Sequence, residues 1–186
     1  MIKLSVYNFL SLNGYYKDAS NGIDWHHHEQ GGEEEQFSDN NLKHENALLF
    51  GRVTYEMMAG FWPTPMAAEM YPGTAKGMNK AKKYVVSNTL QQADWANTTI
   101  INTDLVTAVR QLKETSDRDI TILGSGSLVS QLTDAGLIDG YQVMIDPVAL
   151  KAGTPIFYNV QHDVELRLTG SRVFKSGIVL LEYAPA

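Results

Sequence analysis

The sequence predicts an α/β protein with a mostly parallel, mixed sheet, helices on both faces and a C-terminal antiparallel hairpin. Short apolar runs rich in β-branched residues recur along the chain. Amphipathic segments with a helical period lie between several of these runs, an alternation that is typical of parallel sheets. Near the C-terminus, two segments of alternating character flank Lys175-Ser176-Gly177, which indicates a hairpin.

Composition narrows the class of protein. A chain of 186 residues fits a single domain spanning 1–186 and buries roughly 70% of its unfolded surface. It has no cysteine, which excludes disulfides, a thiolate nucleophile and a cysteine-ligated zinc site. The net charge of −6 argues against a nucleic-acid partner. We see neither a signal peptide nor an apolar run long enough to cross a bilayer, so we expect a cytoplasmic protein without a membrane partner.

The first half of the chain opens with a strand. Residues 2–10 alternate and then become almost wholly apolar, which predicts a central strand. Residues 15–35 are rich in Gly, Asn, Asp and His and predict a long loop. The elements expected next are a helix at 36–46, a buried strand at 47–50 ended by Gly51, a helix at 52–59 stopped by Pro63 and Pro65, and a loop with some helical content up to Ala81.

The second half alternates strands and helices. The helix beginning near Asp104 is the clearest, because Leu105, Ala108, Val109 and Leu112 follow the i, i+3, i+4, i+7 spacing. The other expected elements are strands at 83–87 and 99–102, a strand at 120–123, a helix from 128 to 135, a strand at 141–145, an irregular loop at 147–155, and a hairpin built from 164–168 and 178–182.

Three of the predicted strands run directly into glycine or small polar residues, at Gly51–Thr54, Ser87–Asn88 and Gly124–Ser127. Ligands of open α/β sheets bind at the carboxyl ends of the strands. Two of the three turns open helices, whose unpaired N–H groups favour phosphate oxygens. Arg52 adds a planar charge suited to phosphate. Each turn alone is a common loop feature, but together they predict a cradle for a pyrophosphate.

Two familiar motifs are absent from these turns. The dinucleotide fingerprint G-x-G-x-x-G fails because its third glycine position is Val129. The nucleophile-elbow pattern G-x-S-x-G fails around Ser125 and Ser127. The sequence therefore predicts neither a Rossmann domain nor an α/β-hydrolase.

The motifs are similar to those of a known superfamily. They comprise Gly51-Arg52-Val53-Thr54-Tyr55-Glu56 with Phe61-Trp62-Pro63, Lys83-Tyr84-Val85-Val86-Ser87, Ile122 to Leu128, and Gly153-Thr154-Pro155-Ile156-Phe157. In order and spacing they resemble the dihydrofolate reductase superfamily, above all relatives of the C-terminal reductase domain of the bifunctional riboflavin-biosynthesis deaminase-reductase. The resemblance implies a dihydrofolate-reductase-like three-layer fold, NADP(H) as cofactor and a homodimer. It also implies an NADPH-dependent reductase of a pteridine-like, pyrimidine-like or carbonyl substrate, with 5-amino-6-(5-phosphoribosylamino)uracil reductase activity as one form.

The resemblance also assigns residues to the cofactor. Arg52 and Thr54 are expected at its phosphates, Ser87 and Asn88 at the ribose phosphate of its adenosine end, and the turn after 123 at the pyrophosphate. The complete expected cofactor-binding set is Asn8, Leu12, Gly51, Arg52, Val53, Thr54, Ser87, Asn88, Gly124, Ser125, Gly126, Ser127 and Leu128.

Catalytic residues are harder to assign, because hydride transfer asks the protein mainly to orient the cofactor, exclude water and supply a proton. The candidates are Asn13, Trp25, Tyr55 and Trp62. For the aromatic residues, packing in the core is the alternative.

Two other functions stay open. The family commonly has Asp where this chain has Asn13, so a module that binds NADP(H) without turnover is the alternative function. His26-His27-His28-Glu29 invites a metal site, but adjacent loop residues point in different directions and no H-E-x-x-H pattern exists, so we expect none. A histidine of this loop could instead donate a proton during reduction.

Overall fold

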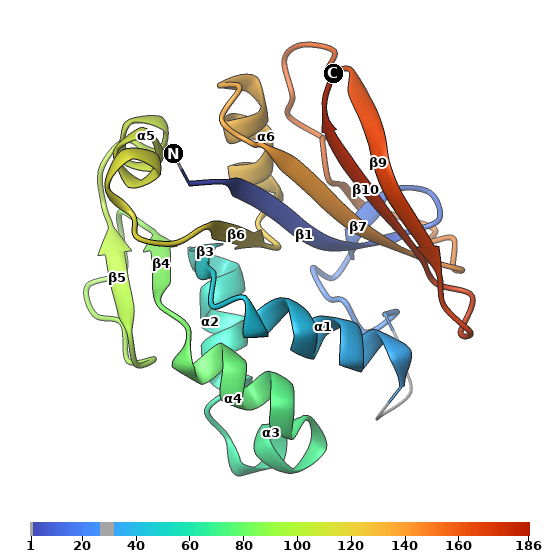
Figure 1. Ribbon diagram of the computed structural model, residues 1–186, viewed down its shortest axis with the longest axis horizontal. Helices are drawn as coiled ribbons and strands as arrows, with labels where there is room; N and C mark the ends of the chain where they lie inside the picture. The colour runs from blue at the N-terminus through green and yellow to red at the C-terminus, as the bar shows by residue number, and fades with distance from the viewer. Residues whose placement is uncertain (1, 27–31) are drawn as a thin grey trace.

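Strand β1 (Leu4–Ser11) lies inside an eight-stranded sheet, between β6 and β7. Its alternate residues Leu4 and Val6 are fully buried there. The structure is a computed structural model that describes residues 2–26 and 32–186 (Figure 1). The strand order is β5-β4-β3-β6-β1-β7-β10-β9. The other strands of this sheet are β3 (Ala47–Gly51), β4 (Lys83–Val86), β5 (Thr98–Ile101), β6 (Ile120–Leu123), β7 (Gly140–Asp146), β9 (Leu166–Val173) and β10 (Val179–Pro185).

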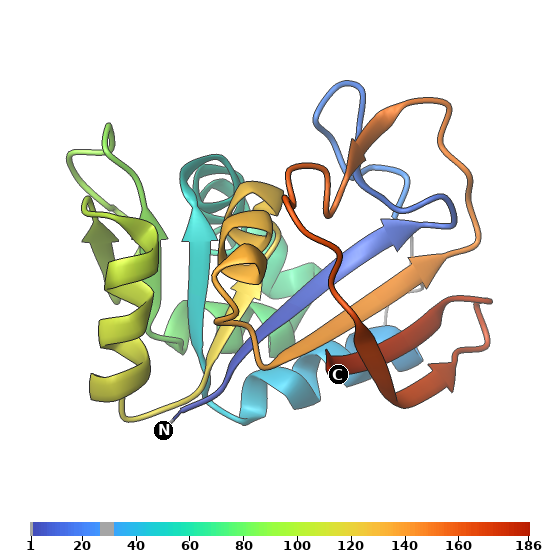
Figure 2. The ribbon, with the colours of Figure 1, turned by 90° about the horizontal axis from the view of Figure 1, so that it is seen from above.

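The sheet is mixed, as the sequence predicts. All neighbours from β5 to β7 run parallel, whereas β10 is antiparallel to both β7 and β9. The six helices of the described chain are α1 (Glu33–Lys43), α2 (Arg52–Phe61), α3 (Pro65–Met70), α4 (Pro72–Lys80), α5 (Leu105–Thr115) and α6 (Gly126–Asp134). Figures 1 and 2 show α5 and α6 on one side of the sheet and α1, α3 and α4 on the other. The three layers of the predicted fold are therefore present.

Each face of the sheet has its own apolar core. Towards α5 and α6, the core contains Leu4, Val6 and Ile122 with Val109 and Leu132 of the helices. Towards α2 and α4, it contains other strand residues with Tyr55, Met78 and Trp95. A third cluster, Met144, Phe174, Ile178 and Leu180, packs beneath α1 through Phe37. Burial of apolar side chains at these interfaces contributes about 1.5–3 kcal/mol for each large residue.

The structure corrects two predicted loops. Within 15–35, residues Tyr15–Asp18 form strand β2, which pairs with β8 (Gly153–Pro155) of the loop predicted at 147–155. All four residues of β2 are only half-buried, so the sequence has no alternation of apolar and polar residues that would predict this strand. Helix α1 also begins at Glu33, ahead of the predicted residue 36, with three acids in the first turn where the helix dipole favours negative charge.

The segment between Phe61 and Ala81 is more helical than predicted. Pro65 and Pro72 each occupy the first turn of a helix, α3 and α4, and the side chain of Thr64 caps the first of them. Proline is favoured at this position because its missing N–H would have no partner inside the helix. Pro65, which was predicted to help stop α2, thus also starts α3. Across the described chain, no helix combines the length and the apolar character that crossing a membrane requires.

Lys83 is fully buried at the start of β4. Its ammonium donates hydrogen bonds to the carbonyl oxygens of Met78 (2.8 Å), Asn79 (3.2 Å) and Ala81 (2.7 Å) and lies 4.5 Å from the centre of the Trp95 ring. Burial lowers the pKa of Lys83 to about 8. The side chain thus ties the C-terminal end of α4 to the sheet.

We expect Lys83→Met to lower the free energy of unfolding by about 1–3 kcal/mol at neutral pH, because the carbonyl oxygens lose their donor. The loss should grow as the pH rises from about 8 towards 10.5. In that range the native amine has released its proton while the unfolded chain still holds it, so the wild-type protein gains stability. Urea unfolding of both proteins at several pH values measures this difference; a difference that shrinks with rising pH would contradict it.

Candidate functional site

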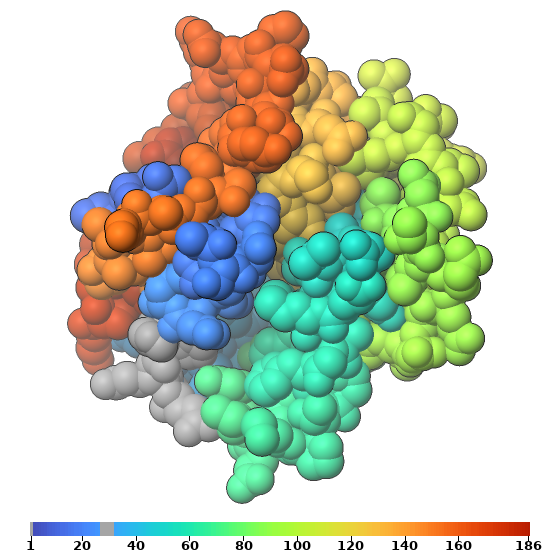
Figure 3. Space-filling model, turned by 180° about the vertical axis from the view of Figure 1, so that it is seen from behind, coloured from blue at the N-terminus to red at the C-terminus, as the bar shows by residue number. Residues whose placement is uncertain are grey.

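The turns after β3 and β6 are joined by hydrogen bonds at the carboxyl edge of the sheet. The Gly51 N–H donates to Ser125 Oγ at 2.6 Å, and this hydroxyl donates to Thr54 Oγ1 at 3.0 Å. A side chain at Gly51 would meet Ser125 Oγ at 2.8 Å, so only glycine permits this approach. Figure 3 looks onto this edge and shows the segment around β2 in blue, α2 in teal and α6 in gold around a hollow.

The turn before α6 has an unusual backbone. Gly124 and Ser125 are consecutive residues in the left-handed region, with φ of 62° and 60°. Ser125 pays a conformational penalty there that glycine does not pay. A Cβ on Gly124 would also meet Thr54 Cγ2 at 2.9 Å. Successive N–H groups in such turns form a concavity that binds anions, and the N-terminus of α6 follows immediately.

The third turn lies beside the first. Gly51 is paired with Val86, so the chain after β4 emerges next to the chain after β3. Ser87 is buried and its Oγ accepts the N–H groups of Thr89 (3.1 Å) and Leu90 (2.9 Å), which fixes the turn. One cleft is lined by all three turns, which contribute Gly51, Arg52, Val53, Thr54, Ser87, Asn88, Gly124, Ser125, Gly126, Ser127 and Leu128.

Asn8 projects from β1 into the same cleft. Only 5% of this residue is exposed, and its Nδ2 has no hydrogen-bond partner among the described residues. A buried amide without a partner costs free energy, so this atom calls for a ligand acceptor. The cleft thus offers an unpartnered amide donor on β1 and a glycine-lined concavity at the start of α6, two groups that could hold an acceptor atom and an anion of one ligand.

Tyr16 is a cleft residue that sequence reasoning missed. Its ring lies against Gly126, where an added Cβ would come within 2.7 Å of the ring. Burial raises the pKa of Tyr16, and the backbone N–H of Gly126 partly offsets this rise. The hydroxyl therefore stays protonated at neutral pH and lies at the helix terminus that the anion would use. No local sequence pattern predicts the place of Tyr16 in the cleft, because its contact with Gly126 depends on the pairing of β2 with β8.

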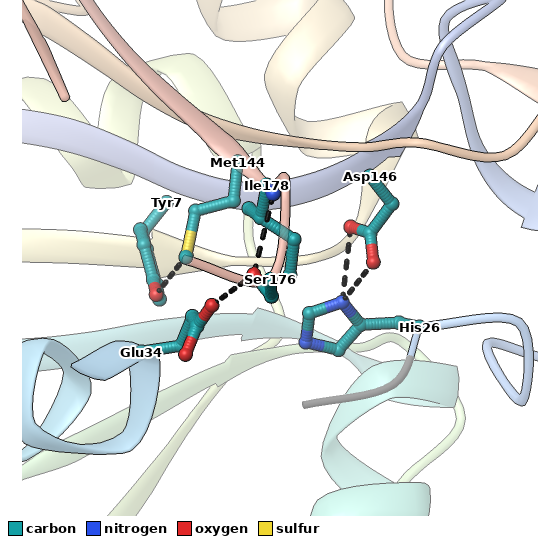
Figure 4. A network of polar contacts seen from close by, with 7 residues as sticks. All are labelled: Tyr7, His26, Glu34, Met144, Asp146, Ser176 and Ile178. Atoms are coloured by element: carbon teal, nitrogen blue, oxygen red, sulfur yellow. Dashed lines mark hydrogen bonds and ion pairs between the residues drawn. The ribbon is translucent and has the colours of Figure 1, made fainter. Parts of the chain in front are cut away.

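A second group of polar side chains lies on the α1 side of the sheet (Figure 4). His26 Nδ1 is 2.9 and 3.0 Å from the two carboxylate oxygens of Asp146, at the carboxyl end of β7. Tyr7 lies nearby, and burial, with the negative charges of Asp146 and Glu34, raises its pKa to about 12. Sequence reasoning also missed Asp146, although a polar residue that follows a predicted strand in a parallel sheet was a usable signal.

Among the predicted catalytic candidates, Trp62 lines the cleft and its indole N–H lies 3.0 Å from Met58 Sδ. Tyr55 does not line it: its ring is in the core, and its hydroxyl accepts the N–H of Trp95 at 3.1 Å. Trp25 makes an edge contact with His26, 6.3 Å between ring centres, outside the lining.

Two predicted residues of the loop after β1 also lie outside the cleft lining, although both belong to the described ranges. Leu12 is 68% exposed. Asn13 clamps the loop after β7: its Nδ2 donates to the Leu150 carbonyl (2.8 Å), and its Oδ1 accepts the Leu150 N–H (3.1 Å). A carboxylate could not make the first of these bonds. Asn13 thus has a structural role, in holding the backbone of Leu150, that the comparison with Asp at this position did not predict.

The metal alternative rested on residues 26–29. Residues 27–29 lie outside the described residues, and His26 is engaged with Asp146. Within residues 2–26 and 32–186, no group of three His, Asp or Glu side chains is placed to hold a metal ion.

This strand order, with a cleft at the carboxyl ends of its parallel strands, defines a dihydrofolate-reductase-like fold. The family model of the RibD C-terminal domain matches residues 3–180, and the chain belongs to this family. The uncharacterised protein YyaP of Bacillus subtilis (strain 168) is 27% identical over 174 residues, which cover 94% of this chain and 90% of that protein.

Solved structures agree on the fold. A putative riboflavin biosynthesis protein from Shewanella sp. PV-4 superposes with a TM-score of 0.78 at 18% identity, covering 100% of this chain and 99% of that one. A diaminohydroxyphosphoribosylaminopyrimidine deaminase/5-amino-6-(5-phosphoribosylamino)uracil reductase from Thermotoga maritima gives a TM-score of 0.69 at 13% identity. This chain is covered completely and spans 57% of that longer one.

The junction between the turns predicts a pair of stability effects. Ser125→Ala removes the acceptor of the Gly51 N–H and should lower the free energy of unfolding by about 1–3 kcal/mol. Ser125→Gly removes the same hydroxyl but suits the left-handed backbone, so its loss should be smaller by about 0.4–1 kcal/mol. Denaturant unfolding followed by tryptophan fluorescence measures both, and equal losses would show that the backbone conformation carries no cost.

Proposed function

We propose that this protein is an NADPH-dependent reductase of a small heterocyclic or carbonyl substrate. The observation that carries the proposal is the cradle formed by Gly51, Ser125 and the turn after β4, which lies beside the buried Asn8 amide in one cleft. Membership of the RibD C-terminal domain family supports it, because reductase domains of riboflavin biosynthesis share this fold.

In this proposal, different segments of the chain bind different parts of the cofactor. The Ser87 and Asn88 turn takes the adenosine end, and Arg52 supplies a positive charge for the phosphate on its ribose. The N–H of Ser127 takes the pyrophosphate at the positive end of α6, since the Gly126 N–H is hydrogen-bonded to the Tyr16 hydroxyl. Asn8 donates its free N–H to the nicotinamide carboxamide. A bound nicotinamide supplies a hydride, and the protein orients it and keeps the site dry.

Binding of NADP(H) without turnover is a different function for the same cleft. It was suggested by Asn13, but this side chain is bonded to Leu150 away from the cleft lining, so no specific observation favours it. Purified protein assayed for loss of NADPH absorbance with 7,8-dihydrofolate and with 5-amino-6-(5-phosphoribosylamino)uracil separates the two functions. A reductase consumes cofactor with a substrate of this class; binding without consumption favours the module.

Arg52→Ala should weaken NADPH binding about tenfold, equivalent to about 1.4 kcal/mol, and weaken NADH binding less. The Arg52 side chain is 44% exposed at the cleft, so its guanidinium can turn from Glu56, which it contacts at 2.9 Å, to a phosphate. Arg118→Ala is the matched control, because Arg118 pairs with Asp117 outside the cleft lining. Fluorescence titration measures the dissociation constants. If Arg52→Ala weakens the binding of NADPH and of NADH equally, Arg52 does not bind the extra phosphate of NADPH. If the wild-type protein binds neither cofactor, the proposed function is overturned.

We also propose that two copies pair along β9, an edge strand of the sheet whose Leu168 and Val173 are 52% and 73% exposed. Light scattering on the eluting protein should give twice the mass of one chain. Leu168→Glu with Val173→Glu should give single chains, because charges on an edge strand oppose pairing. Met66→Glu, at an exposed residue of α3, should leave the mass unchanged. A wild-type mass of one chain would contradict the proposal.

A further inference from the structure

The side chains of His26 and Asp146 form a buried pair at the carboxyl end of β7. Their side chains are 6% and 4% exposed, and both carboxylate oxygens lie within 3.0 Å of His26 Nδ1. The ring also stacks on Phe9, with 3.7 Å between ring centres and 15° between planes. Two independent contacts therefore fix the position and the orientation of one imidazole.

This orientation has a chemical consequence. Because Nδ1 faces Asp146, it carries a proton, and Nε2 lies on the opposite side of the ring (Figure 4). His26 lines the cleft, whereas Asp146 does not. The carboxylate thus holds the ring so that an imidazolium can present its second N–H to a ligand, as in other histidine–carboxylate pairs.

The sheet order places this pair near the reacting end of the cofactor. The cradle is at the end of β6, and in the proposed arrangement the adenosine end extends over β3 towards Ser87, which follows β4. The other end of the dinucleotide must then extend the opposite way, over β1 and towards β7. Neighbouring strands are about 4.8 Å apart, so β7 lies about 10 Å from β6. Phe9 on β1 and Asp146 on β7 lie on that path.

We propose that His26 is the proton donor of the reduction and that Asp146 is its positioning residue. This inference rests on the proposed function. The substrate class follows: it carries a C=O or C=N bond whose carbon accepts the hydride. The π-electron pair of that bond moves to the oxygen or nitrogen, which takes the proton from Nε2. His26 is left as a neutral imidazole, still bonded to Asp146, and regains a proton from water.

The neighbouring groups suit this role. Among the described residues, Tyr7 from β1 lies close enough to Asp146 and to Glu34 of α1 for their charges to raise its pKa. Tyr7 stays protonated at neutral pH because its pKa is raised to about 12, and its hydroxyl lies 2.9 Å from Met144 Sδ. Glu34 accepts a hydrogen bond from Ser176. Of these side chains, His26 is the one that both lines the cleft and is oriented by a carboxylate.

NMR of ¹⁵N-labelled histidine rings tests the placement without any substrate. The probes are NADP⁺ and adenosine 2′,5′-bisphosphate, which lacks the nicotinamide. The Nε2 resonance of His26 is assigned by its loss in His26→Gln. We expect this resonance to shift with NADP⁺ and not with adenosine 2′,5′-bisphosphate. His162, exposed outside the cleft lining, is the control ring and should respond to neither.

The outcomes separate the two proposals. If backbone N–H resonances of the Gly124–Ser127 turn shift with both ligands while the His26 ring responds to neither, the proton-donor inference is overturned and the reductase proposal survives. If neither ligand shifts any resonance, the reductase proposal fails.

Kinetics add a second test with whichever of 7,8-dihydrofolate and 5-amino-6-(5-phosphoribosylamino)uracil the wild-type protein reduces. His26→Gln should lower kcat by about 10²- to 10⁴-fold and leave the NADPH dissociation constant unchanged. Asp146→Asn should lower kcat less and displace the pH profile of kcat, which loss of stability alone would not do. A kcat within threefold of wild type for His26→Gln would overturn the inference.

Discussion

The cleft depends on one hydrogen bond, from the Gly51 N–H to Ser125 Oγ. It links residues separated by 74 positions and joins the two turns that open α2 and α6. The close approach requires glycine at 51, and the turn requires glycine at 124, where a side chain would strike Thr54. A serine held in the left-handed region is a local cost that the surrounding contacts must offset. The turn that we propose as an anion cradle is thus held in place by contacts within the fold.

The sequence predicted the main sheet because its strands carry local signals. Residues 47–50 and 120–123 are apolar runs followed by glycine, and α5 has an unbroken helical spacing. Strands β2 and β8 gave no such signal, since they are short, half-buried and defined by pairing with each other. Pairing between distant segments is a tertiary property that a local pattern cannot reveal.

The same distinction explains the site. The three turns could be predicted to meet because the carboxyl ends of parallel strands share one edge. The pairing of His26 with Asp146, 120 positions apart, could not be predicted, since it depends on the path of the loop between β2 and α1. Tyr55 lies in the core, the alternative that the sequence left open for it, and its hydroxyl accepts a hydrogen bond from the Trp95 N–H.

Strand β1 explains how one cleft can serve two ligands. Successive side chains of a strand point to opposite faces, so Asn8 faces the α6 side, with Val6 and Leu10, while Phe9 faces the α1 side with Tyr7. The unpartnered amide is therefore on the side of the anion cradle, and the aromatic ring that supports His26 is on the other. Asn8 and Phe9 are adjacent residues in the second half of β1, and both line the cleft. In the reductase that we propose, the two faces of β1 would separate cofactor recognition from proton supply.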